Sequence, residues 1–171
     1  MQQSIESNRL LLRPFSPNDA ERVAELAGDE VIAEMTANIP HPYAVSDAES
    51  WIGTHEALFL SGKGVVFAIV LKESFELIGA ISFPKLDNGL GVLGYWLGVS
   101  FWGNGYATEA SKALISFSKE HYGLTTLQVM HLVENERSRS VIEKLGAKYV
   151  GNEINRMQGR VREVCMYLSE V

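Results

Sequence analysis

The sequence predicts an α+β fold in a single domain covering residues 1–171, and three observations predict it. The length falls within the size of one ordinary domain. Short apolar runs of strand length alternate with helical patterns of apolar residues. Neither an internal repeat nor a low-complexity linker divides the chain. With 46% hydrophobic residues the chain is too apolar to stay disordered, so we expect one packed core.

Composition excludes several classes of function. The formal net charge of −6 disfavours nucleic acid as a partner and favours cationic partners. The chain has one cysteine, Cys165, and four scattered histidines, so we expect neither a disulfide nor a metal site. No apolar run approaches the roughly 20 residues of a membrane-spanning helix, and the N-terminal residues do not resemble an export signal. We therefore expect a cytoplasmic protein without a membrane partner.

The first part of the chain predicts one strand followed by helices. The apolar run at residues 9–13 is typical of a strand, and a proline stops it. Ser16 is the expected N-cap of a helix that ends at Gly28, because Pro17 suits the first helical position. A broken helical segment follows as far as Met35.

A loop, a helix and a hairpin are expected next. Two prolines keep residues 39–43 out of a helix. Ser46 and Glu49 match a capping box, which opens the next helix. Residues 65–71 and 77–83 then predict two strands of a β-hairpin.

The second half of the chain alternates strands and helices. A strand at residues 90–99 runs directly into a helix at about residues 105–122. A strand at 127–133, a short helix at 138–145 and a last strand at 161–168, in a final hairpin, complete the pattern. The whole chain therefore predicts about six to seven strands and about four helices.

The most informative segment is the loop at residues 102–110, between an apolar strand and an amphipathic helix. Gly103 and Gly105 let backbone N–H groups converge, and the helix that follows presents the positive end of its dipole. Such a loop suits a pyrophosphate. No Gly-Lys-Ser/Thr follows, and Thr108 replaces the third glycine of a dinucleotide fingerprint, so both common nucleotide motifs are absent. The alternative is a tight turn without a ligand.

Three segments together resemble the GCN5-related N-acetyltransferases, and among them the group of the ribosomal-protein alanine acetyltransferases. In chain order they are residues 9–14 with Asp19, residues 93–97 leading into the acyl-coenzyme A loop at 102–107, and residues 135–138 with 143–146. Two positions depart from the family pattern. Trp102 stands where the family has Arg or Gln, and Ala147 stands where it often has Phe.

The resemblance implies a single N-acetyltransferase domain with a central mixed, mostly antiparallel sheet that splays in the middle. It also implies acetyl-coenzyme A as cosubstrate and no metal. In this family the pantetheine arm lies between two parted parallel strands, here residues 90–99 and 127–133. The implied cofactor contacts are Leu97, Gly98, Val99, Gly103, Asn104, Gly105, Tyr106, Ala107, Thr108 and Asn135.

The resemblance further implies direct acyl transfer to an amine, with a protein group that assists the leaving thiolate. Many relatives use a tyrosine at the position of Ile142, which has no proton to donate. Ser138 lies one turn earlier on the same helical face, where similar ribosomal-protein acetyltransferases have serine. Ser138 is therefore the expected catalytic residue. Ser138 and Asn135 each have an alternative interpretation as a helix cap.

No residue stands out as the general base, for which the candidates are Glu34, His41, Glu109 and His131. We expect an acetyl-coenzyme A-dependent N-acetyltransferase that acts on the α-amine of a protein or peptide. A small-molecule amine (an amino acid, a polyamine or an antibiotic) is the alternative acceptor. A coenzyme A-binding module without catalysis is the other alternative. The expected assembly is a monomer or a homodimer.

Overall fold

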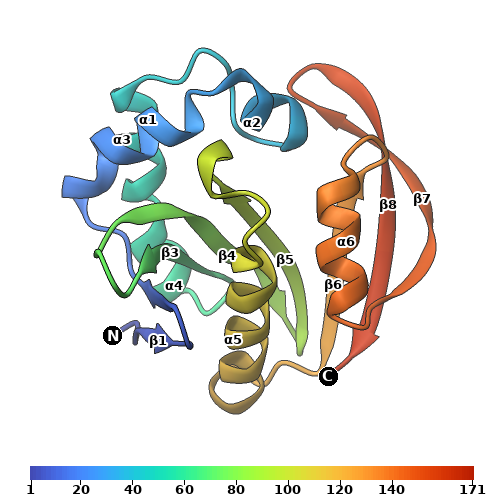
Figure 1. Cartoon of the computed structure of the whole chain (residues 1–171). Helices are drawn as coiled ribbons and strands as arrows, with labels where there is room; N and C mark the ends of the chain where they lie inside the picture. The colour runs from blue at the N-terminus through green and yellow to red at the C-terminus, as the bar shows by residue number, and fades with distance from the viewer.

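The computed structural model describes residues 1–171 and shows one sheet with helices on both of its faces (Figure 1). The eight strands follow the order β1-β2-β3-β4-β5-β6-β8-β7, and all neighbours are antiparallel except β5 and β6. The strands are β1 (Ile5–Glu6), β2 (Leu10–Arg13), β3 (Val65–Leu71), β4 (Leu77–Asp87), β5 (Leu90–Leu97), β6 (Thr126–Leu132), β7 (Lys148–Met157) and β8 (Arg160–Glu170). The expected α+β fold with a mixed, mostly antiparallel sheet is confirmed.

The helices form two groups. They are α1 (Ala20–Ala27), α2 (Glu30–Met35), α3 (Val45–Gly53), α4 (His55–Leu60), α5 (Tyr106–His121) and α6 (Glu136–Lys144), with 3₁₀ turns at Pro17–Asp19 and Val99–Phe101. In Figure 1, α5 and α6 lie in front of the sheet. Helices α1 and α3 pack against the other side of β5, where Trp96 contacts their small apolar cluster.

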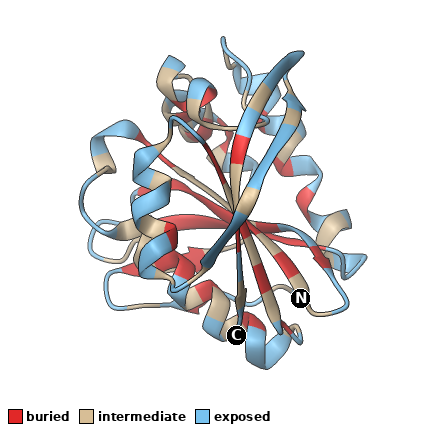
Figure 2. Ribbon diagram, turned by 90° about the vertical axis from the view of Figure 1, so that its right-hand side faces the viewer, coloured by how far each residue is buried: buried red, intermediate tan, exposed pale blue.

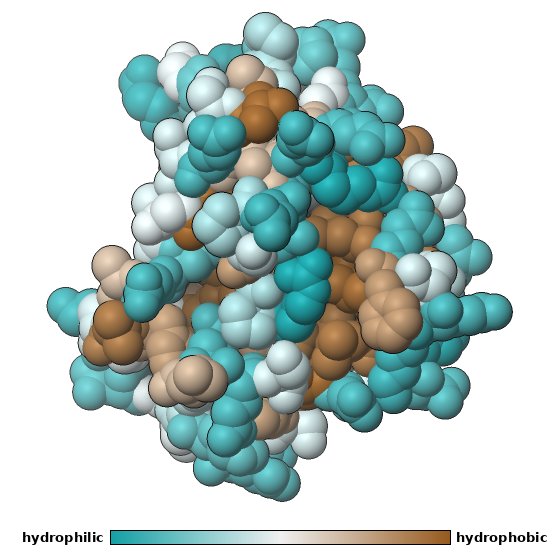
Figure 3. Space-filling model, turned by 90° about the vertical axis from the view of Figure 1, so that its left-hand side faces the viewer, coloured by the Kyte–Doolittle hydropathy of each residue, from teal (hydrophilic) through white to brown (hydrophobic).

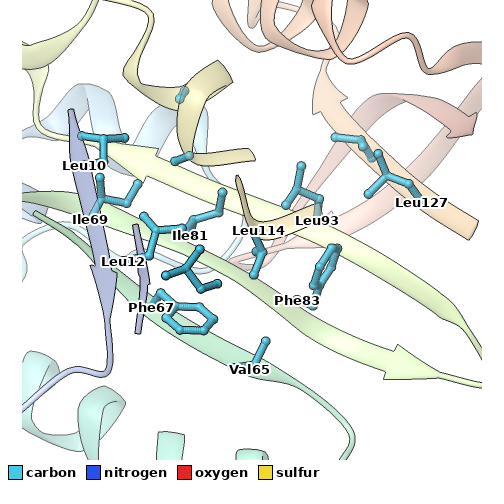
Figure 4. Packing of buried hydrophobic residues seen from close by; sticks show 14 of the residues in the cluster. Leu10, Leu12, Val65, Phe67, Ile69, Ile81, Phe83, Leu93, Leu114 and Leu127 are labelled. Atoms are coloured by element: carbon cyan, nitrogen blue, oxygen red, sulfur yellow. The ribbon is translucent and has the colours of Figure 1, made fainter. Parts of the chain in front are cut away.

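The main core lies between the sheet and the pair α5 and α6. Leu10 and Leu12 of β2 are fully buried while the residues between and after them are half-buried, as the two-residue period of a strand requires. Figure 4 shows Leu10, Leu12, Phe67 and Ile81 of the sheet, which belong to one cluster with Leu114 of α5. Figure 2 shows the buried residues concentrated along the central strands. The sheet is thus held against α5 by one continuous apolar cluster.

One expected N-cap is confirmed and a second one was wrong. The Ser16 hydroxyl does accept the Asn18 N–H, as expected of an N-cap. The predicted capping box at Ser46 was wrong: the N-cap of α3 is Ala44, two residues earlier, and the Asp47 carboxylate accepts the Ala44 N–H at 2.8 Å. Asp47, three residues after the N-cap, does for Ala44 what Glu49 was expected to do for Ser46. The two possible helix starts therefore have a similar carboxylate to cap them.

One long strand, β7, was not predicted from the sequence. Strand β7 lies at the edge of the sheet, pairs only with β8, and exposes most of its residues. Its sequence lacks the alternation of apolar and polar residues that marks a half-buried strand. The final hairpin is therefore β7–β8, longer than the predicted strand at 161–168 alone.

The strands β5 and β6 part in the middle of the sheet. They pair in register from Leu90 and Thr126 only as far as Leu93 and Val129. Beyond this point β5 continues along β4 and β6 continues along β8, so the two strands diverge toward the top of Figure 1. Strand β5 ends at Leu97, two residues before the predicted end, because Val99 already belongs to the 3₁₀ turn.

The surface view of the side nearest the N-terminal elements shows mainly hydrophilic residues, with apolar side chains visible in a hollow (Figure 3). Among the helices, the structure shows none that has both the length and the apolar character needed to span a membrane.

The core between α5 and the sheet makes a direct stability prediction. Leu114→Ala removes a fully buried side chain, so we expect the free energy of unfolding to fall by about 2–5 kcal/mol. Lys112→Ala on the exposed face of the same helix should change it by less than about 0.5 kcal/mol. Urea unfolding followed by circular dichroism measures both. Equal effects of the two substitutions would contradict this description of the core.

Candidate active site

A cavity lies where β5 ends, bounded by the loop at residues 102–108 and by the exposed side of α6. The loop contributes Gly103, Gly105 and Thr108, and α6 contributes Ser138 and Lys144. This cavity contains the segment that the sequence analysis singled out as an anion site. We call it the cofactor cavity.

The two loop glycines are required by their backbone conformation. Gly103 has φ +81° and Gly105 has φ +79°, values that residues with a side chain rarely adopt. Space is not the constraint, since a Cβ on Gly103 would meet nothing within 4 Å and a Cβ on Gly105 would lie 3.5 Å from the Arg9 Nη2 atom. Gly105 is the N-cap of α5, and the first intrahelical N–H to be bonded is that of Glu109. The N–H groups of residues 106–108 are therefore free to bind an anion.

The turn between β1 and β2 holds this loop in place from outside the cavity. The Arg9 guanidinium donates to the Asn104 carbonyl at 2.9 Å and to the Glu109 carboxylate at 2.7 Å. Glu109 also accepts from the Ser7 hydroxyl and the Arg9 N–H. Burial opposes ionisation of Glu109, but these hydrogen bonds outweigh it and lower the pKa of the carboxyl below its ordinary value. Glu109 therefore positions the loop and does not serve as a base.

Trp102, one of the two departures from the family pattern, brings a positive charge to the cavity. Its indole N–H donates to the Leu97 carbonyl at 3.0 Å, and the Arg137 guanidinium lies 3.4 Å above its ring. Arg137 and Lys144 both line the cavity. Arg137 was not among the predicted site residues, because nothing in the sequence signals that the third residue of the 135–138 motif contacts the Trp102 ring.

The backbone at the end of β5 has one edge turned toward the gap. The Gly98 N–H donates to the Ile78 carbonyl on β4 at 2.8 Å, so it is not available to a ligand. Because successive N–H groups of a strand point to opposite edges, the Leu97 N–H faces the gap left by β6. Val99 lies in the 3₁₀ turn and is 36% exposed. Of the three expected backbone contacts, Leu97 is the best oriented for a ligand amide.

A second cavity adjoins the first and opens on the other side of the β5 end. Trp51 and Trp96 form an aromatic wall with Tyr43, and Asp47 lies beside them. Trp51 packs edge-on against His55 with ring centroids 4.5 Å apart, and burial lowers the pKa of His55 to about 4, so its ring is neutral at pH 7. We call this apolar-walled space the acceptor cavity.

The candidate catalytic helix begins between the two cavities. Asn135 is the N-cap of α6: its Oδ1 accepts the Ser138 N–H at 3.2 Å, and its Nδ2 donates to the Ser138 Oγ at 3.1 Å. The predicted helix start at residue 138 was thus too late by two residues, and the cap interpretation of Ser138 was wrong. Ser138 instead lines both cavities. Ile142, one turn further, is fully buried in the main core and does not reach either cavity.

The four candidate bases lie apart from one another. His131 lines the acceptor cavity, but its ring nitrogens are bonded to the Leu132 carbonyl at 2.7 Å and the Tyr167 hydroxyl at 3.1 Å. Glu34 pairs with Arg160 at the surface, and His41 is exposed. Glu109 lies behind the loop, as described above. The structure therefore brings only His131 to the cavities.

Comparison with known proteins identifies the architecture. A family model described as an acetyltransferase (GNAT) domain matches residues 9–148 of the chain. The chain belongs to this family. It is 29% identical over 169 residues to the uncharacterized N-acetyltransferase p20 of Bacillus licheniformis, with 96% of this chain and 94% of that protein covered.

Two solved structures show the same fold. RimL, a ribosomal L7/L12 alpha-N-protein acetyltransferase solved with coenzyme A, superposes with a TM-score of 0.89 at 19% identity, covering 99% of this chain and 98% of that one. The microcin C7 self-immunity acetyltransferase MccE, solved with acetyl-CoA and AMP, gives 0.87 at 21% identity, with coverages of 96% and 94%. The chain is an acetyl-CoA-dependent N-acetyltransferase of the GNAT family, so the alternative of a module without catalysis is set aside.

The left-handed glycine at the start of α5 makes a prediction about cofactor affinity. Gly105→Val forces a β-branched residue into φ +79°, at a cost of about 1–3 kcal/mol unless the loop rearranges. We expect affinity for acetyl-CoA to fall more than tenfold, about 1.4 kcal/mol, by calorimetric titration.

Gly53→Val is the matched control, since Gly53 lies at the end of α3 and a Cβ there meets nothing within 4 Å. It should leave the affinity unchanged. A folded Gly105→Val protein that binds acetyl-CoA as tightly as the wild type would refute the loop assignment.

Proposed function

We propose that this enzyme acetylates the α-amino group at the N-terminus of a protein or peptide. The observation that carries the proposal is that the carboxylate and the imidazole lining the acceptor cavity are both engaged in structural hydrogen bonds. The Asp47 carboxylate caps α3, and both ring nitrogens of His131 are bonded. An acceptor amine must then arrive largely neutral by itself.

The pKa of the acceptor decides which amines meet this condition. An α-amine has a pKa of about 7.7–8.0 and is appreciably neutral near pH 7, whereas a lysine side chain, at about 10.4, is not. The difference of more than two pKa units corresponds to roughly 3 kcal/mol of extra assistance for lysine. A cavity without a free base therefore favours α-amines over lysine side chains.

The entrance of the acceptor cavity also suits the end of a chain. The tip of the β7–β8 hairpin reaches across to the segment around α2: Gln158 donates to the Ile39 carbonyl at 2.7 Å, and Arg162 donates to the Glu34 carbonyl at 3.3 Å. Arg160 pairs with the Glu34 carboxylate at 3.4 Å. This bridge favours an acceptor that enters end-on. The net charge of −6 would draw basic peptides toward it, with a steering effect that weakens as salt is raised.

We propose one orientation of the cosubstrate in the cofactor cavity. We assign the pyrophosphate to the free N–H groups of residues 106–108, with Arg137 and Lys144 supplying positive charge from α6. The pantetheine arm then lies along the gap beside Leu97, with the thioester toward Ser138. Direct transfer forms the C–N bond and breaks the C–S bond without a covalent enzyme intermediate. Protein N-termini are produced where proteins are made, so the proposal includes a cytoplasmic location.

Ser138 is the proposed donor to the leaving thiolate. Its Oγ accepts from Asn135, and the only neighbouring group that can accept its own proton is the Tyr95 hydroxyl. Ser138→Ala should lower kcat by about 10²-fold with little change in acetyl-CoA affinity, because the interaction forms mainly in the transition state. Ser116→Ala, an exposed serine on α5, serves as the control. If kcat of Ser138→Ala stays within about twofold of the wild type, Ser138 only shapes the helix start.

A competition assay tests the acceptor class. Equal concentrations of a basic peptide with a free N-terminus, the same peptide blocked at its N-terminus but carrying lysines, and a mixture of polyamines and amino acids are offered with acetyl-CoA. Mass spectrometry should find the free N-terminal peptide acetylated preferentially. Preference for the blocked peptide or for the small amines would overturn this choice of acceptor and leave the acetyltransferase assignment unaffected.

A further inference from the structure

The reacting atoms must lie where the two cavities meet. Acyl transfer requires the acceptor nitrogen and the thioester carbon in contact, one entering from each cavity. The residues that line both cavities are Met35, Thr36, Tyr95, Trp96, Asn135 and Ser138. Any side chain that assists the chemistry directly is expected in this set.

Most donors in this set are already engaged or point elsewhere. The Thr36 hydroxyl donates to the Ile32 carbonyl at 2.7 Å. The Asn135 amide donates to Ser138 and, at 3.4 Å, to the Met35 carbonyl. Trp96 packs on the other face of β5, against the α1 and α3 cluster. The hydroxyls of Ser138 and Tyr95 are the two that remain.

Tyr95 lies immediately beyond the point where β5 and β6 part. It is two residues after Leu93, the last residue of β5 paired with β6, and its side chain lies on the same face as Leu93 and Leu97, against the core beneath α6. The Tyr95 hydroxyl is buried and has no hydrogen-bond partner of good geometry, although the Ser138 hydroxyl is its neighbour. A buried hydroxyl without a partner is unusual, because leaving it unpaired costs free energy.

We propose that Tyr95 is a second catalytic residue, whose hydroxyl donates a hydrogen bond to the thioester sulfur as it leaves, beside the hydroxyl of Ser138. The acceptor nitrogen forms the C–N bond with its lone pair, the C–S bond breaks, and its electron pair departs on sulfur. The Tyr95 proton stays on its oxygen throughout. The attacking nitrogen loses its proton to water, and the thiolate takes its final proton from water.

The acidity of the two partners supports donation without proton transfer. Burial raises the pKa of Tyr95 to about 12, against a smaller lowering by the Ser138 hydroxyl, so Tyr95 is protonated at pH 7. An ordinary thiol has a pKa of about 8.5. A thiolate is thus too weak a base to remove the tyrosine proton, but it is a good acceptor of a hydrogen bond. The inference rests on acetyl transfer from acetyl-CoA and is independent of the acceptor's identity.

Tyr95→Phe removes only the hydroxyl and provides the test. If Tyr95 donates to sulfur, the thiol pKa of bound coenzyme A should be higher in the variant than in the wild type by at least about 1, measured from the ultraviolet absorbance of the thiolate in a pH titration. With acetyl-CoA and whichever amine the enzyme accepts, kcat should fall about 10- to 10²-fold, the loss expected for a hydrogen bond to a charged group, while affinity for the cosubstrate is kept. The melting temperature should change little, since the lost hydroxyl makes no hydrogen bond of good geometry.

Tyr149→Phe is the matched control, because it removes the phenol hydroxyl of a β7 residue that lines neither cavity. The other charged groups around the two cavities, Arg137, Lys144 and Asp47, are unchanged in both variants, so a difference in thiol pKa reports the Tyr95 hydroxyl. The titration needs only coenzyme A and is read without an acceptor. An identical thiol pKa in wild type and Tyr95→Phe would overturn the proposal, whatever the acceptor proves to be.

Discussion

The parting of β5 and β6 after Leu93 and Val129 is the constraint on which the site depends. Four residue pairs join the two strands, and each strand then follows a different neighbour. Backbone N–H and C=O groups that face the resulting gap lack the partners that a continuous sheet would supply. A ligand with amide groups can supply them, as an added strand would. The gap thus supports both the location and the chemistry of the proposed cofactor site.

Two sets of side chains turn this gap into a specific site. Outside it, Arg9 bonds to both Glu109 and the loop carbonyl of Asn104, so the turn between β1 and β2 helps to position the N–H groups that we propose bind the pyrophosphate. Inside it, Trp102 bonds to the end of β5 and supports Arg137 above its ring. Trp102, which departs from the family pattern, carries no charge itself, but its ring supports the Arg137 guanidinium of α6.

The sequence predicted the parts of the site that depend on local chemistry. Gly103 and Gly105 predicted the turn, because their backbone conformations are costly for other residues. The strand before it and the helix after it were predicted from the spacing of their apolar residues. It did not predict what depends on distant pairings. The Arg9 contact joins residues about a hundred positions apart in the chain, and the bridge from Gln158 to Ile39 joins two loops. In the sequence, Tyr95 is an ordinary aromatic residue in a strand. Its place in the lining of both cavities and its buried hydroxyl without a well-formed hydrogen bond are visible only in the structure.

Amide hydrogen exchange, measured residue by residue by NMR with and without coenzyme A, tests the central claim that the ligand occupies the gap between β5 and β6. The account predicts slower exchange at the Leu97 amide and at residues 106–108 when coenzyme A is bound. The Gly98 amide, already bonded to Ile78 on β4, should change little. Unchanged exchange at Leu97 under saturating coenzyme A would contradict the account, because the backbone that the parted strands leave open would then have no part in binding.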